Sequence, residues 1–85
     1  MVSRRVTVKN PSGLHVKPAE IFSKAAEDCS SKVEVLYGNN IINAKSLLNL
    51  LAVAIHQGAV IELRCTGPDE EADLEKMVQV MDQLE

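Results

Sequence analysis

The feature that most constrains the fold is a repeated alternation of apolar and polar residues in short runs along the chain. VIELRCT (60–66) alternates without interruption, and RRVTVK (4–9) and KVEVLY (32–37) follow the same pattern. Because successive side chains of a strand point to opposite faces, each run predicts a strand with one buried face.

Between these runs the apolar residues recur at spacings of three and four, which indicates helices. The first helix is expected to start near Val16, because Pro18 has no amide hydrogen and fits only in a first helical turn. A second, short helix is expected after Ser46, over LLNLLAVAI, with Gly58 ending it. A third follows Asp69, with acidic residues in its first turn and then an apolar stripe.

A Gly-Asn-Asn turn (38–40) leads into a short strand near residues 41–43, which predicts a hairpin. The expected order is therefore strand, helix, strand, strand, helix, strand, helix. Strands with one buried face favour an antiparallel-rich sheet whose helices gather on its apolar side. We expect an α+β two-layer sandwich, with residues 1–85 forming one domain.

The charge balance argues against nucleic-acid binding. The 85 residues carry 9 Lys and Arg against 12 Asp and Glu, a formal net charge of −3, so no basic stripe is expected. Phe22 and Tyr37 are the only aromatic residues, which leaves almost nothing on which bases could stack. No apolar run reaches the roughly 18 residues that a membrane span needs, and no signal-peptide pattern is present. We therefore expect a cytoplasmic protein without direct membrane insertion.

Cys29 and Cys65 lie far apart in the sequence, with no neighbouring residues that would complete a metal site. In a cytoplasmic protein such cysteines act as small apolar side chains. His56 also lacks acidic or cysteine partners and is expected at the surface. We expect no metal and no cofactor.

The stretch PSGLHVKPAE (11–20) places His15 at the expected start of the first helix. The amides of Val16 and Lys17 have no helical acceptor there, and unpaired amides at a helix start attract anions. Imidazole is also a covalent nucleophile, and Lys17 adds a mobile positive charge. The position suits a phosphoryl acceptor, although an exposed or capping histidine is the alternative explanation. Ser12 could donate a hydrogen bond to such a group or could act only in the turn.

GLHVKPAE (13–20) resembles the active-site signature of the HPr family, the histidine phosphocarriers of the bacterial phosphotransferase system. AKSLLNLLAVAIHQGAVIEL (44–63) is similar to the family's second signature, and TGPDEEADLEKMVQVM (66–81) to its last helix. The resemblance covers essentially the whole chain. It implies an open-faced two-layer βαββαβα sandwich, with a four-stranded antiparallel sheet and three helices on one face.

The resemblance also implies that His15 is the phosphoacceptor. It would receive a phosphoryl group from phosphorylated Enzyme I and pass it to IIA proteins or domains for sugar uptake. The phosphate would originate in phosphoenolpyruvate. Such a protein is a phosphoryl-transfer intermediate rather than a free-standing enzyme, and a monomer is expected. Lys17 stands where the family has arginine. A compact ammonium charge thus replaces the planar, fork-shaped guanidinium group, and it still neutralises phosphate.

Ser46 is expected to cap the second helix. The resemblance implies in addition a regulatory phosphorylation site, with an HPr kinase/phosphorylase and a catabolite-control transcription factor as further partners. It also implies that Leu47, Leu48 and Leu51 form the surface that docks partner proteins.

Two alternatives stay open, and only the second of them is a phosphocarrier of the same family. One is a regulatory binding module of carbon catabolite control that acts through phosphorylated Ser46, and the other is a nitrogen-branch phosphocarrier. A structural or RNA-binding sandwich ranks last, given the acidic charge and the lack of aromatic residues.

Overall fold

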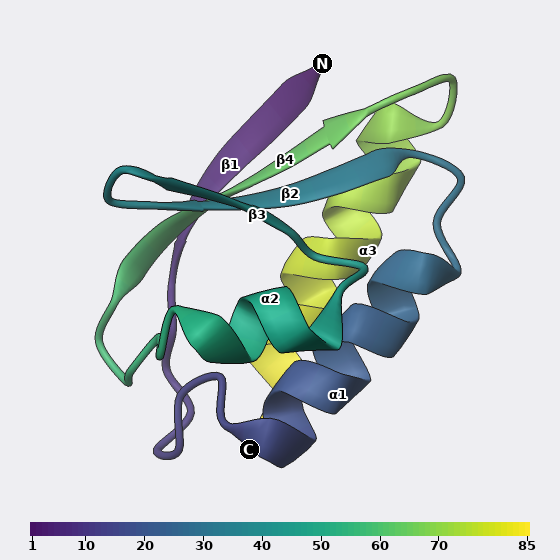
Figure 1. Ribbon diagram of the computed structural model, residues 1–85. Coiled ribbons are helices and arrows are strands. Elements are labelled where there is room, and N and C mark those ends of the chain that lie inside the picture. The colour runs from purple at the N-terminus through teal and green to yellow at the C-terminus, as the bar shows by residue number, and fades with distance from the viewer.

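Four strands form one antiparallel sheet in the order β1-β4-β2-β3, and three helices cover one of its faces (Figure 1). The computed structural model describes residues 1–85. Its elements are β1 (Val2–Thr7), α1 (Val16–Glu27), β2 (Lys32–Tyr37), β3 (Asn40–Asn43), α2 (Leu47–Ala52), β4 (Val60–Thr66) and α3 (Glu70–Gln83). The predicted element order and the open-faced α+β sandwich are confirmed.

The two central strands build the core as their alternation predicts. In β4, Ile61, Leu63 and Cys65 are at most 1 % exposed, while the residues between them reach the other face. Leu63 lies opposite Val35 and Cys65 opposite Val33 in the neighbouring strand β2. Cross-strand pairs of this kind are the unit that stabilises a sheet, so the buried face is continuous across the centre.

Two long helices supply the other layer of the core. α1 buries Ala19, Phe22 and Ala26, and Phe22 is completely enclosed. Burying such a side chain stabilises a fold by roughly 1.5–3 kcal/mol. α3 buries a stripe made of Leu74, Met77, Val78 and Met81. None of the three helices combines the length and the apolar character that a bilayer crossing would need.

The first strand begins and ends two residues before its predicted bounds of 4–9. Its ladder to β4 runs from Val2 opposite Cys65 to Thr7 opposite Val60. Val8 is fully buried, but it leaves the ladder, because it bonds to the turn before β4 instead: its N–H donates to the carbonyl of Ala59, and its own carbonyl accepts from Gly58.

The second helix is shorter than predicted. It ends at Ala52, with Val53 as its C-cap residue, and does not continue toward Gly58. Ala54 takes a positive φ of 50°, which turns the chain away from the helix axis. Left-handed backbone is uncommon for alanine, so apolar periodicity could not reveal this break.

Both cysteines are free thiols in the core, which confirms their interpretation as small apolar residues. Burial raises the pKa of the Cys65 thiol to about 11, and burial also raises the pKa of Cys29. Both thiols are therefore protonated at neutral pH and poorly reactive.

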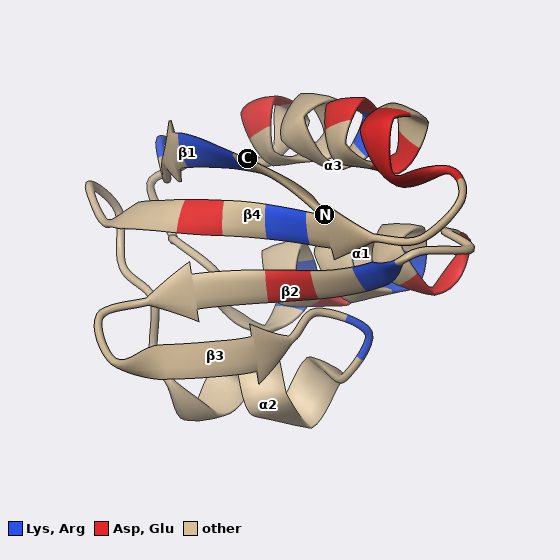
Figure 2. Cartoon of the chain, turned by 90° about the horizontal axis from the view of Figure 1, so that it is seen from above, with Lys and Arg blue, Asp and Glu red and all other residues tan.

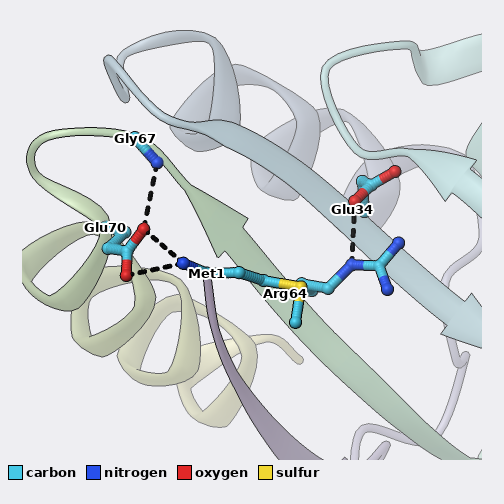
Figure 3. A network of polar contacts seen from close by, with 5 residues as sticks. All are labelled: Met1, Glu34, Arg64, Gly67 and Glu70. Atoms are coloured by element: carbon cyan, nitrogen blue, oxygen red, sulfur yellow. Dashed lines mark hydrogen bonds and ion pairs between the residues drawn. The ribbon is translucent and has the colours of Figure 1, made fainter.

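Charged residues occur in strands β1, β2 and β4 and along α3, whose first turn is acidic (Figure 2). On the sheet, Arg64 Nε of β4 donates a 2.9 Å hydrogen bond to Glu34 Oε1 of β2 (Figure 3). This hydrogen bond lowers the pKa of Glu34. At the start of α3, the Glu70 carboxylate accepts from the amino group of Met1 and from Gly67 N–H, and these bonds lower its pKa.

Candidate functional site

The loop before α1 is held in place by its own turn and by the segment that follows α2. Gly13 N–H donates to the carbonyl of Asn10 at 3.0 Å, and the Asn10 side-chain amide donates to the Gly13 carbonyl. Leu14 N–H donates to the carbonyl of Ile55 at 2.9 Å. Asn10 and Leu14 are both buried. The residue that follows, His15, therefore starts from a fixed backbone.

His15 is the N-cap of α1, with φ −77° and ψ −175°, and its side chain makes no capping hydrogen bond. The side chain is exposed, and the carbonyl of His15 accepts the first helical bond, from Ala19 N–H at 2.8 Å. The amides of Val16 and Lys17 donate to no group within the chain. An unengaged imidazole thus stands beside two unengaged N–H donors at the positive end of a helix.

A groove of about 640 Å³ opens at this point between the start of α1 and the end of α3. His15, Lys17 and Ser12 all line it, so three residues that the sequence singled out come together. Figure 1 shows the end of the chain beside the start of α1. There the Ser12 hydroxyl donates a long 3.4 Å hydrogen bond to the main-chain oxygen of Glu85. Lys17 is exposed and forms no ion pair within the chain.

The apolar wall of this groove was not anticipated from the sequence. It consists of Ile21 on α1 together with Val80 and Leu84 from the end of α3. Ile21 is 51 % exposed. A signal was present, because Ile21 falls outside the apolar stripe of the helix and lies on the same side of it as Lys17 and Lys24, four residues before it and three after it. Its proximity to α3 depends on packing between residues that are distant in the chain.

Ser46 lies on a different element and does not line the groove. It is the N-cap of α2, as predicted, and its hydroxyl accepts a 3.3 Å hydrogen bond from Asn49 N–H. Leu48 is 78 % exposed, Leu47 and Leu51 are half-buried, and Leu50 is fully buried. The helix therefore presents an apolar surface to solvent while one leucine anchors it to the core.

The structure contains no group of three or more His, Cys, Asp or Glu side chains placed to hold a metal ion. His56 is exposed, as predicted, and lies outside the groove. The fold and site together define a class of protein: a small α+β sandwich that presents one histidine, free of other bonds, at the start of its first helix.

Comparison with known proteins shows which family of that class this is. Residues 2–83 match the family model described as the PTS HPr component phosphorylation site. The phosphocarrier protein HPr of Haemophilus influenzae is 35 % identical over 85 residues, which cover all of both chains. The HPr-like protein Crh of Halalkalibacterium halodurans is 33 % identical over 92 % of this chain and 93 % of its own.

The solved structures agree. HPr-C-His from Thermoanaerobacter tengcongensis has a TM-score of 0.92 and 33 % identity, over 96 % of this chain and 92 % of that chain. The chain belongs to the HPr family, the phosphocarriers of the phosphotransferase system.

Proposed function

We propose that this protein accepts a phosphoryl group on His15 from phosphorylated Enzyme I and passes it to IIA proteins or domains. The observation that carries the proposal is the exposed His15 imidazole at the N-cap of α1, next to the unengaged amides of Val16 and Lys17. Membership of the HPr family supports the reaction class and the kind of partners.

The chemistry follows from these groups. A lone pair on a ring nitrogen of neutral His15 attacks the phosphorus of the donor, a new nitrogen–phosphorus bond forms, and the bond to the donor breaks with its electron pair leaving on the donor. The proton on the other ring nitrogen is not transferred in this step. The amides of Val16 and Lys17 then donate to the phosphoryl oxygens, as amides do at other phosphate-binding helix starts.

Lys17 is the residue we assign to charge neutralisation. It lies in the same groove as His15 and has no acidic partner in the chain, so its ammonium group is available. A lysine provides a compact charge on a flexible stem and no bidentate fork, so it neutralises phosphate without fixing its orientation. We expect Lys17→Arg to preserve or raise the transfer rate.

Incubation with phosphoenolpyruvate and a general Enzyme I tests the proposal. We expect an acid-labile phosphate on the wild type that is absent from His15→Ala and retained by His56→Ala. His56 is the matched control because it is the other histidine of the chain, is exposed and lies outside the groove. A wild type that takes no label from Enzyme I would refute the function.

For partner docking we propose Leu47, Leu48 and Leu51. These residues give α2 its solvent-facing apolar surface, and a contiguous exposed apolar surface on a small domain indicates an interaction site. Transfer from Enzyme I and transfer to a panel of IIA proteins would show which partners use it. The same panel separates a sugar-branch carrier from a nitrogen-branch carrier.

We also propose that Ser46 is a regulatory phosphorylation site, which the resemblance to the HPr family and the position of the residue support. Ser46 is partly exposed and precedes the proposed docking leucines. A phosphate would add about two negative charges there. We expect Ser46→Asp to slow transfer from Enzyme I and Ser46→Ala to leave it near the wild-type rate. Equal rates for both variants would reduce Ser46 to a helix cap.

A further inference from the structure

A single lysine in the turn between β3 and α2 reaches the end of α1. Lys45 Nζ donates a 3.0 Å hydrogen bond to the carbonyl of Cys29, which follows the last turn of α1. The contact is partly buried, and Lys45 forms no ion pair with any carboxylate. Because helix C-terminal carbonyls carry partial negative charge, an ammonium group is favoured at this position.

A second bond joins the same residue to the middle of α1. The Ser23 hydroxyl donates a 3.2 Å hydrogen bond to the Lys45 carbonyl. Ser23 is only 3 % exposed, so it is a polar residue on the buried face of a helix. A buried hydroxyl needs a partner, and the one that it has here belongs to the turn that leads into α2.

Apolar packing also holds the helix after this turn, since Leu47 and Leu51 lie partly buried against the core. α2 has six residues, and Leu50 is the only one of them that is buried. An isolated helix of that length is not stable in water, so its position depends on anchors outside it. Ser46, its N-cap, follows Lys45 directly.

We propose that Ser23 and Lys45 form a clamp that positions α2 against α1, so that the docking leucines and His15 present one surface to a partner protein. The inference rests on the proposed phosphocarrier function. Ser23 and Lys45 are positioning residues. The Ser23 hydroxyl holds the turn through the Lys45 carbonyl, and the Lys45 ammonium group holds the turn to the end of α1.

Three variants test the clamp. Ser23→Ala removes one bond without changing the charge, and Lys45→Met removes the other while keeping the length of the side chain. Lys32→Met is the control, because Lys32 lines the same surface hollow as Lys45 but contacts only Glu34, at 3.6 Å, and no group of α1. Each variant is assayed for transfer from phosphorylated Enzyme I and for phosphorylation by phosphoramidate, a small donor that needs no docking surface.

We expect Ser23→Ala and Lys45→Met to raise about three- to tenfold the KM that phosphorylated Enzyme I shows for this protein as its substrate. The reason is that a smaller fraction of the variant molecules holds the competent arrangement. The kcat value and the rate with phosphoramidate should stay at the wild-type level. The amides of α2 should exchange with solvent faster in both variants than in Lys32→Met.

Three results would overturn the clamp. The first is an unchanged KM in both variants. The second is a KM raised equally by Lys45→Met and Lys32→Met but not by Ser23→Ala, which would indicate charge attraction alone. The third is a fall in the rate with phosphoramidate, which would place the effect at His15 itself. If Enzyme I fails to phosphorylate even the wild type, the proposed function is refuted. The clamp is then tested separately by hydrogen exchange, and it is refuted if the amides of α2 exchange no faster in Ser23→Ala and Lys45→Met than in Lys32→Met.

Discussion

The N–H of Leu14 donates a 2.9 Å hydrogen bond to the carbonyl of Ile55, and this bond connects the residue before His15 to the segment after α2. Gly13 makes the approach possible. It has a φ of +62°, and a Cβ atom built on it would lie 2.5 Å from the same Ile55 oxygen. The loop that presents His15 is thus fitted against a second backbone segment with no space for a side chain.

Gly13→Ala should therefore be costly. We expect a loss of about 2–4 kcal/mol in the free energy of unfolding, because a left-handed alanine and a backbone clash add together. Urea unfolding measures it. Gly38→Ala is the control, since Gly38 has a similar φ of +59° but nothing within 4 Å of its added Cβ. Equal losses in the two variants would show that the contact with Ile55 contributes nothing.

Leucines of α2 should divide into two kinds. Leu48→Ala should change the free energy of unfolding by less than about 0.5 kcal/mol, because the side chain is 78 % exposed. The substitution should nevertheless raise the KM of phosphorylated Enzyme I for this protein as its substrate. Leu50→Ala should cost about 2–5 kcal/mol, because Leu50 is fully buried. Thermal unfolding combined with transfer kinetics checks both, and an unaltered KM for Leu48→Ala would remove this residue from the docking surface.

Ala54→Gly should stabilise the protein. The positive φ of 50° costs alanine about 1–2 kcal/mol and costs glycine nothing, while the greater freedom of glycine in the unfolded chain offsets part of that gain. The expected net increase is about 0.5–1 kcal/mol in the free energy of unfolding. Denaturant titration decides the matter, and a less stable variant would contradict the observed backbone.

At low pH, Glu34 should no longer contribute to the free energy of unfolding. The hydrogen bond from Arg64 lowers the pKa of Glu34 in the folded state, so the stabilisation is complete above the ordinary carboxyl pKa and disappears as the pH falls through the lowered value. Glu34→Gln should cost about 1 kcal/mol at neutral pH and almost nothing in acid. Urea unfolding of both proteins across this range measures the difference. A pH-independent difference would exclude the ion pair as its cause.

Much of the fold could be predicted because its signals are local. The alternation in residues 60–66 identified the core side of β4, and Pro18 fixed the start of α1. The early end of α2 could not be predicted, because it depends on Ala54 adopting a backbone conformation that alanine seldom takes. The bounds of β1 were also missed, because its pairing with β4 decides them and that partner is distant in the sequence.

The site divides in the same way. His15, Lys17 and Ser12 are neighbours in the chain, so a motif could bring them together. Val80 and Leu84 reach the groove only through the packing of α3 beside α1. The bond between Ser23 and Lys45 spans 22 residues and requires the hairpin to bring the turn back to α1. Contacts of this length are set by the tertiary fold and leave no pattern in a single segment.

The central claim is that a phosphoryl group on His15 is received by the amides of Val16 and Lys17. Phosphorus and amide NMR of the protein after phosphorylation by Enzyme I tests it most directly. The account predicts one phosphorus signal coupled to the His15 ring and selective changes in those two amide signals. A phosphoryl group on any other residue, or a phosphorylated His15 that leaves both amides unchanged, would contradict it.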